Sequence, residues 1–158
     1  MPDIIISDTS CLILFDKIGE LELLNKVYGN IITTPEIAAE FGESLPDWIF
    51  VSPVKDKKYQ EFLETQIDLG EASALALAKE TDNALLLLDD LKARKLASKL
   101  KLKYTGSLGV INKAKQLGII KQVKPLIDKI ILTDFRIADN IVSEILKINN
   151  EIENKSTE

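Results

Sequence analysis

Two unbroken apolar runs constrain the fold of this chain more than any other feature. Each is followed closely by an acidic residue and then by a helical pattern. The first run, residues 4–6, is followed after one serine by Asp8. The second, residues 85–88, is followed directly by Asp89 and Asp90. A short continuous apolar run predicts a strand buried on both faces of a parallel sheet. We therefore predict a parallel sheet whose strands alternate with helices.

The rest of the chain continues this alternation of strands and helices. Further strands are predicted at residues 31–33, at 48–51 near an edge of the sheet, and at 102–104. Helices are predicted at residues 12–18, 21–27, 35–41, 57–65, 69–78, 91–100, 108–117, 123–132 and 137–148, with Thr34 as one N-cap and residues 105–107 capping the helix at 108. The expected fold is a three-layer α/β/α sandwich with a mainly parallel central sheet.

The length of the chain bounds its domain organisation. A chain of 158 residues is long enough for one hydrophobic core and short for two. We expect a single domain over residues 1–149 and a polar, disordered tail over residues 150–158.

The composition excludes several kinds of chemistry. The chain has no histidine, which excludes Ser-His-Asp triads, Cys-His pairs and zinc-binding helices of the HExxH type. Its one cysteine, Cys11, has no partner for an internal disulfide, which favours a reducing compartment. The first residues carry no basic leader and no stretch approaches the apolar length of a membrane span. We expect a soluble, cytoplasmic protein.

The acidic residues at the two strand ends predict a metal site. Carboxyl ends of parallel strands meet at one edge of a sheet, so Asp8 and the pair Asp89 and Asp90 are expected to lie close together. Neighbouring carboxylates repel one another, and a cation relieves that repulsion. Because these carboxylates supply only oxygen ligands, Mg²⁺ or Mn²⁺ is expected rather than zinc. Such an ion activates water for phosphodiester cleavage.

The net charge is compatible with this chemistry on nucleic acid. With 25 acidic and 20 basic residues the chain carries a net charge of −5, which excludes binding of nucleic acid through bulk positive charge. Contacts must then be local, through the metal or through the basic run between Lys92 and Lys103, although a lysine-rich helix is usually just a solvated face.

Each acid also has a simpler structural explanation. Asp8 and Asp90 both fit the N-cap of the helix that follows them. Glu71 fits the first turn of a helix, where the helix dipole favours an acid, and Glu40 fits a solvated helix surface. The residues taken alone leave the structural and the functional explanations open.

Four segments, in order, resemble the acidic motifs of the PIN-domain family. They are residues 6–10 (ISDTS), 34–41 (TPEIAAEF), 70–78 (GEASALALA) and 87–94 (LLDDLKAR). The last of these, followed by residues 105–110 (TGSLGV), is similar to a prokaryotic PIN-like branch known as a domain of unknown function. The resemblance extends from about residue 3 to about residue 148.

This resemblance implies a Mg²⁺- or Mn²⁺-dependent endoribonuclease that cleaves single-stranded RNA, often the toxin of a toxin–antitoxin pair whose small antitoxin protein is its partner. It implies metal-binding and catalytic roles for Asp8, Glu40, Glu71 and one of Asp89 or Asp90, with Asp90 favoured by position. Residues expected to support this site are Ser10 beside Asp8, Arg94 as a phosphate contact or an ion pair with Asp90, and Thr105 and Ser107 at a helix start.

One departure from the family pattern supports an alternative function. The third acid of toxin members is often Asp, whereas this chain has Glu71, which is longer by one methylene. The alternative is a catalytically weak or inactive PIN-like module that binds nucleic acid or protein. A phospho-aspartate receiver ranks lower, because its acid pair would follow the first strand. The apolar helix faces near residues 12–27 and in the last helix are compatible with a homodimer, although core packing explains them equally well.

Overall fold

A computed structural model describes residues 2–135 and 139–151 of the chain. In these ranges one sheet of five parallel strands forms the centre of the molecule, in the order β3-β2-β1-β4-β5. The strands are β1 (Ile4–Ser7), β2 (Ile31–Thr33), β3 (Ile49–Val51), β4 (Ala84–Leu87) and β5 (Lys103–Thr105). The predicted parallel sheet is confirmed, and the short strand β3 lies at its edge as expected.

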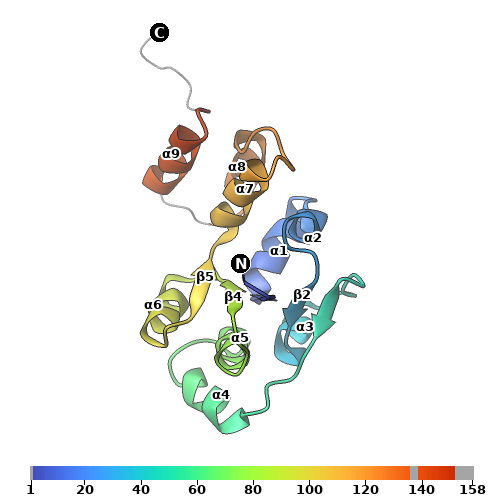
Figure 1. Cartoon of the computed structure of the whole chain (residues 1–158), viewed down its shortest axis with the longest axis vertical. Helices are drawn as coiled ribbons and strands as arrows, with labels where there is room; N and C mark the ends of the chain where they lie inside the picture. Colours follow the sequence, from blue (N-terminus) through green and yellow to red (C-terminus); the bar gives the residue numbers. More distant parts are fainter. Residues whose placement is uncertain (1, 136–138, 152–158) are drawn as a thin grey trace.

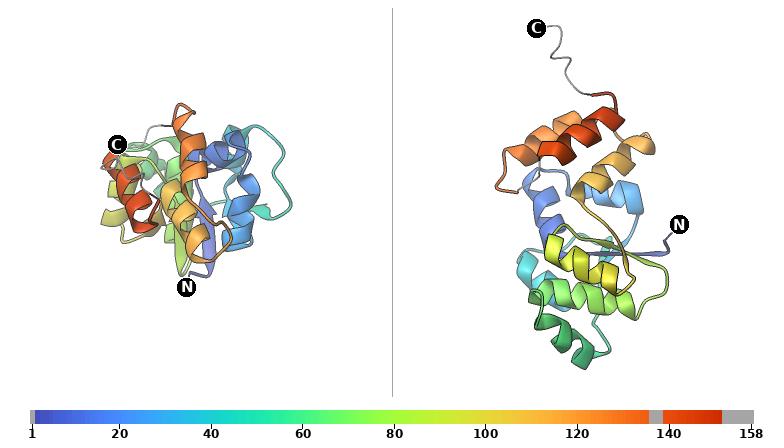
Figure 2. Two further views of the ribbon diagram at one scale, coloured as in Figure 1. Left: turned by 90° about the horizontal axis from the view of Figure 1, so that it is seen from above. Right: turned by 90° about the vertical axis from the view of Figure 1, so that its left-hand side faces the viewer.

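Helices connect the strands and cover both faces of the sheet (Figures 1 and 2). On one side α5 packs on β1 and β4, with α4 outside it; on the other, α2 packs on β2 and against α7. The predicted three-layer α/β/α sandwich is confirmed. The helices are α1 (Thr9–Lys17), α2 (Leu21–Tyr28), α3 (Pro35–Phe41), α4 (Lys57–Glu64), α5 (Leu69–Lys79), α6 (Leu91–Lys99), α7 (Ser107–Gln116), α8 (Lys124–Ile131) and α9 (Asp139–Ile148).

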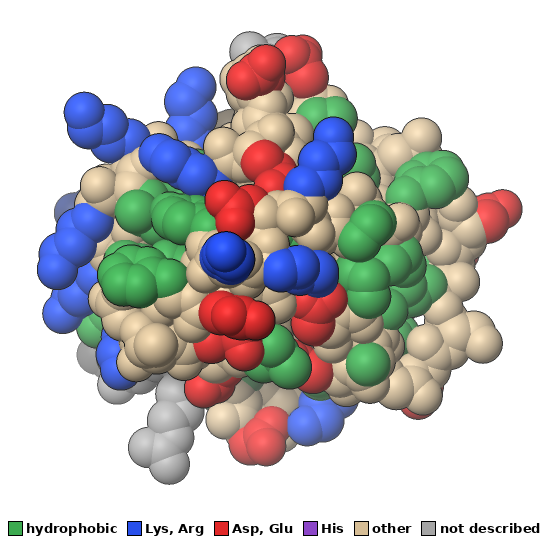
Figure 3. All heavy atoms as spheres, turned by 90° about the horizontal axis from the view of Figure 1, so that it is seen from below, with side chains coloured by type: hydrophobic (Ala, Val, Ile, Leu, Met, Phe, Trp, Pro, Cys, Tyr) green, Lys and Arg blue, Asp and Glu red, His purple; other side chains and the backbone are tan. Residues whose placement is uncertain are grey.

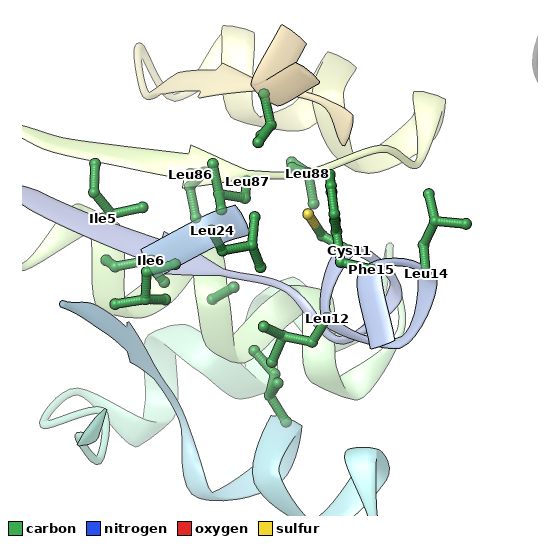
Figure 4. Close-up of a cluster of buried hydrophobic side chains, with 14 of the residues drawn as sticks. Ile5, Ile6, Cys11, Leu12, Leu14, Phe15, Leu24, Leu86, Leu87 and Leu88 are labelled. Carbon is green, nitrogen blue, oxygen red and sulfur yellow. The ribbon is translucent and has the colours of Figure 1, made fainter. Parts of the chain in front are cut away.

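The hydrophobic core fixes the two central strands. Ile6 of β1 and Leu86 of β4 are fully buried in the same hydrophobic cluster as Leu12 and Phe15 of α1 (Figure 4). Helix α5 is buried on almost all sides, as its run of Ala, Leu and Ser predicts. Because these neighbours surround β1 and β4, the ends of the two strands are held in fixed positions.

The pairing register brings the acidic ends of these strands together. Ser7, the last residue of β1, pairs with Leu87, the last residue of β4. The backbone N–H of Asp8 donates to the carbonyl oxygen of Leu87 at 3.0 Å. The acids that follow each strand therefore emerge at the same edge of the sheet, as the sequence predicts.

Two helix starts show where local prediction held and where it did not. Thr34 caps α3, since its hydroxyl accepts a hydrogen bond from the N–H of Ile37 at 3.1 Å. The predicted cap at residues 105–107 is wrong in detail. Helix α7 begins at Ser107, its N-cap is Gly106, and Thr105 is the last residue of β5.

Glu151, the last described residue, is bound to the folded domain. The side chain of Glu151 is 4% exposed and pairs with Lys115 at 2.7 Å. It also accepts hydrogen bonds from the N–H groups of Val123 and Lys124, at 2.8 and 2.9 Å, at the start of α8. Burial raises the pKa of Glu151, but these bonds and the Lys115 charge outweigh it and hold the pKa below its usual value. The first two residues of the predicted tail are thus part of the folded structure.

Residues 152–158 of the predicted tail and Ile137, the first apolar position predicted for the last helix, lie outside the described residues. Within the described ranges, no helix has both the length and the apolar character needed to cross a membrane.

Candidate active site

A cavity of about 540 Å³ opens beyond the carboxyl ends of β1 and β4. Ile13, Leu91 and Phe135 contribute apolar side chains to it, and the described residues that line it include no lysine or arginine. Six carboxylates gather there from loops and helices that are distant in the sequence: Asp8, Glu40, Asp68, Glu71, Asp89 and Asp90. We call this the acidic cavity.

Asp8 is the one buried carboxylate of the six, with 3% exposure. It occupies the N-cap position of α1 but makes no capping hydrogen bond, and Ser10 Oγ donates to its Oδ2 at 3.3 Å. Burial raises the pKa of Asp8 to about 6, and the charges of Glu40 and Asp89 add to the increase, against hydrogen bonds from Thr9 and Ser10. Helix capping therefore does not account for Asp8.

Glu40 is held at the cavity by α1 and α5. The hydroxyl of Thr9 donates to Glu40 Oε2 at 3.0 Å. At Gly70, a Cβ atom would overlap the Glu40 carboxylate and lie 2.9 Å from its Cδ. A glycine at this point of α5 is therefore required for the carboxylate to occupy its position. Neither Thr9 nor Gly70 was identified from the sequence, although a glycine at the start of an alanine-rich helix is a usable signal.

Glu36, one turn before Glu40 on the same helix, has a different role. Its Oε2 accepts a hydrogen bond from Gln60 Nε2 at 2.7 Å and lies 3.7 Å from Lys57 Nζ. Glu36 is thus bound to α4 and does not line the acidic cavity.

Glu71 combines a structural role with a place in the cavity. Its Oε1 accepts the backbone N–H of Asp68 at 3.1 Å, which is one half of a capping box. Burial raises the pKa of Glu71 to about 7, and the charges of Asp8, Asp90 and Asp68 contribute. Asp68 was also missed from the sequence. Its position three residues before Glu71, typical of a capping box, is the signal that points to it.

The adjacent acids Asp89 and Asp90 have different partners. Asp89 Oδ1 accepts the N–H of Ser107 at 2.8 Å and its Oδ2 accepts the Ser107 hydroxyl at 2.5 Å. Asp90 Oδ2 caps α6 through the N–H of Ala93 at 2.9 Å. Asp90 Oδ1 makes no hydrogen bond to the described residues, whereas both oxygens of Asp89 are engaged.

Arg94 does not form the predicted ion pair with Asp90. Its Nε donates to the carbonyl oxygen of Leu88 at 2.7 Å, and the carboxylate it approaches is that of Asp89, at 3.8 Å. The guanidinium group stacks over the ring of Tyr104, 5.3 Å from its centre. This backbone bond, formed six residues away, replaces the expected i, i+4 contact.

The acidic side chains offer metal ligands but not a preassembled metal site. Among the described residues, no three acidic or cysteine side chains are placed to bind one ion together. The chemistry of the donors nevertheless fits a hard divalent cation, because all are oxygen ligands and the lining supplies no positive charge. Burial raises the pKa values of Asp8 and Glu71, and the neighbouring negative charges add to the increase; such an ion relieves this repulsion between the carboxylates.

Together these features define a parallel α/β domain with an acidic site at the carboxyl edge of its sheet. The family model described as a PIN domain matches residues 4–151. The chain belongs to the PIN-domain family, which confirms the resemblance seen in its motifs. PIN domains have a nuclease fold, are generally nucleases acting on nucleic acid and typically use divalent metals. Curated proteins and solved structures give no match to this chain.

Proposed function

We propose that this protein is a Mg²⁺- or Mn²⁺-dependent endoribonuclease that cleaves single-stranded RNA. The observation that carries the proposal is the acidic cavity, in which a buried Asp8 with a raised pKa faces further carboxylates and no basic side chain. In a PIN domain, a cavity of this kind is best explained as the place where a divalent ion meets a phosphodiester.

In this proposal Asp8, Glu40, Glu71 and Asp90 would supply the ligands, and their side chains would have to move closer together to hold one ion. When bound, it activates a water molecule and neutralises charge on the scissile phosphate. Ser10 and Thr9 orient Asp8 and Glu40 through their hydroxyl groups. Asp89 is the remaining candidate ligand, and the two hydrogen bonds from Ser107 fix its carboxylate in one orientation.

The basic face of α6 is a candidate guide for RNA. Its Lys92, Lys95 and Lys99 side chains are exposed. Seen from below, the molecule carries acidic and basic side chains intermixed, with lysine and arginine gathered along the left edge, where α6 lies in Figure 1 (Figure 3). Since the net charge is −5, this local concentration is where electrostatic attraction for a phosphate backbone would act.

We extend the proposal to the biological setting. The protein acts in the cytoplasm as the toxin of a toxin–antitoxin pair and binds a small antitoxin protein, with a homodimer as its form in solution. Exposed apolar side chains such as Leu132 at the end of α8 and Phe50 on β3 are surfaces for such contacts. Co-expression with the protein encoded by the adjacent gene, followed by size-exclusion chromatography with light scattering, tests both the partner and the dimer.

The nuclease proposal is tested with metal-free protein, by comparing single-stranded with duplex RNA and site variants with a control variant. Single-stranded RNA should be cleaved on addition of Mn²⁺ or Mg²⁺, and the same strand in a duplex should resist. Asp8→Asn and Glu40→Gln should abolish cleavage. The control is Glu36→Gln, which alters the same helix as Glu40 but a side chain bound to Gln60, so it should retain activity. Undiminished cleavage by Asp8→Asn would contradict the mechanism.

The alternative function, a PIN-like binding module, predicts a different result in the same assay. The capping bonds of Glu71 and Asp90 and the engaged oxygens of Asp89 favour it, because they reduce the number of carboxylate oxygens available to a metal. A module of this kind would bind RNA or a protein without cleaving RNA at any Mn²⁺ concentration, and calorimetry would detect no ion binding that depends on Asp8.

A further inference from the structure

A second cavity, of about 390 Å³, adjoins the acidic cavity. Asp89 and Phe135 line both cavities and form the boundary between them. Its other walls include Arg94 of α6, Tyr104 of β5, and Ile141 and Ile145 of α9. A volume of this size is within the range of small-ligand sites, which begins at about 300 Å³.

The polar wall of this second cavity is rigid. Arg94 is fixed by its bond to the Leu88 carbonyl and by stacking on Tyr104. It also lies directly over Gly106, where any Cβ atom would overlap the guanidinium group. These contacts engage Nε and one face of the guanidinium group. The other N–H groups of Arg94 make no hydrogen bond to the described residues, and the nearest carboxylate, that of Asp89, lies 3.8 Å away. A planar cation with available donors is thus held beside the acidic cavity.

The rest of the lining is aromatic and aliphatic, and it is partly open to solvent. Tyr104 and Phe135 are half-buried, and Ile141 is 45% exposed. A nucleobase matches this combination, because it has two apolar faces that stack on aromatic rings or on arginine and a polar edge that accepts hydrogen bonds. The single-stranded state is required, because a base in a duplex is stacked between its neighbours.

A third cavity, of about 330 Å³, extends the acidic cavity in another direction. It shares Asp68, Glu71 and Asp90 with the acidic cavity and is lined in addition by Lys92. The acidic cavity therefore adjoins two further cavities. One is lined by Lys92 and the other by Arg94. A strand whose scissile phosphate lies at the carboxylates has room for nucleotides on both sides.

We propose that the cavity between Arg94, Tyr104, Phe135 and α9 binds the base of a nucleotide next to the scissile phosphate. This inference rests on the proposed nuclease function and assigns its substrate-selecting site. The base packs against Phe135 and the stacked Arg94–Tyr104 pair, and Arg94 donates to its edge or to its phosphate. Ile141 and Ile145 form the apolar floor.

The experiment is an abasic scan of a short single-stranded RNA with one mapped cleavage position. Wild-type protein should lose about 10- to 100-fold in kcat/KM when the base at one position beside the cleavage site is removed, and much less at more distant positions. Tyr104→Ala should cleave the intact RNA more slowly and should no longer respond to that abasic position. Tyr104→Phe, which retains the ring, should respond as the wild type does.

A measurement of binding separates failure of this inference from failure of the proposed function. RNA carrying a photoreactive uridine at the sensitive position, irradiated with Asp8→Asn protein, should cross-link to peptides containing Tyr104 or Phe135. RNA that is cleaved with no abasic sensitivity, or cross-links confined to other peptides, would overturn the base site while leaving the nuclease intact. Absence of both cleavage and cross-linking would overturn both proposals. Protection of Ile141 and Tyr104 from hydrogen exchange by a protein partner alone would reassign the cavity to protein binding.

Discussion

Ser107 holds Asp89 with two hydrogen bonds, one to each carboxylate oxygen. The backbone N–H and the hydroxyl of a single residue at the start of α7 thereby orient an acid at the end of β4. We expect Ser107→Ala to lower the free energy of unfolding by about 1–2 kcal/mol, because Asp89 is partly buried and loses a charge-assisted bond. Urea denaturation measures this. Ser98→Ala, at an exposed serine of α6, should change stability by less than about 0.5 kcal/mol.

The pH dependence of stability reports the burial of Asp8 and Glu71 together with their repulsion by neighbouring carboxylates. In the folded protein the pKa of Asp8 is raised from 3.8 to about 6, and that of Glu71 from 4.5 to about 7. Between pH 4 and 7 the native state therefore holds protons that the unfolded state has lost, and by linkage these two groups make stability fall as the pH rises. Denaturation in EDTA at several pH values should show a steeper fall for the wild type than for the Asp8→Asn, Glu71→Gln double variant.

A divalent ion should remove this difference between the wild type and the double variant. In saturating Mn²⁺ the ionised carboxylates gain a ligand, so the wild type should become more stable near pH 7 while the double variant changes little. The prediction fails if both proteins respond equally to Mn²⁺, or if the wild type and the double variant have the same pH slope in EDTA.

Gly70 has an expected effect on activity through Glu40. In Gly70→Ala the new methyl group would displace the Glu40 carboxylate, so Mn²⁺-dependent cleavage should fall by at least about tenfold. Substitutions at Gly70 and Glu40 should also have non-additive effects on stability. Because Glu40→Ala removes the overlapping group, the double variant should be less destabilised than the sum of the single changes, by about 0.5 kcal/mol or more. Strict additivity in this double-mutant cycle would rule out the overlap as the cause.

Thr9 should act through its hydroxyl group alone. Thr9→Val keeps the shape of the side chain but loses the hydrogen bond to Glu40 Oε2, so we expect lower activity and weaker Mn²⁺ binding by calorimetry. Thr9→Ser retains the hydroxyl and should restore most of both. If valine and serine behave alike, Thr9 has only a packing role.

The sequence was most informative where a feature depends on neighbouring residues. The apolar runs before Asp8 and Asp89 predict two buried strands, and the rule that parallel strands share a carboxyl edge is enough to predict that the acids lie together. Thr34 is similarly predictable, because an N-cap bonds only to the amides that follow it. The metal-binding and catalytic roles of these acids stay predictions.

The remaining features depend on packing between distant elements. Gly70 matters because α3 brings Glu40 over the start of α5, and no local pattern specifies that approach. The different surroundings of Asp89 and Asp90 depend on Ser107, which is 18 residues away from Asp89 in the sequence. Such relationships are set by tertiary contacts and so could not be predicted from periodicity or capping rules.

The buried carboxylate of Glu151 links the C-terminal residues to the proposed base site. Lys115 and the first turn of α8 hold Glu151, and the preceding helix, α9, supplies Ile141 and Ile145 to the proposed base site. Proteolysis or a frameshift that removed the chain just before residue 151 would release one end of that helix. The proposed nuclease would then keep every carboxylate of the acidic cavity but lose discrimination among RNA sequences, so that such a truncation would broaden its targets rather than inactivate it.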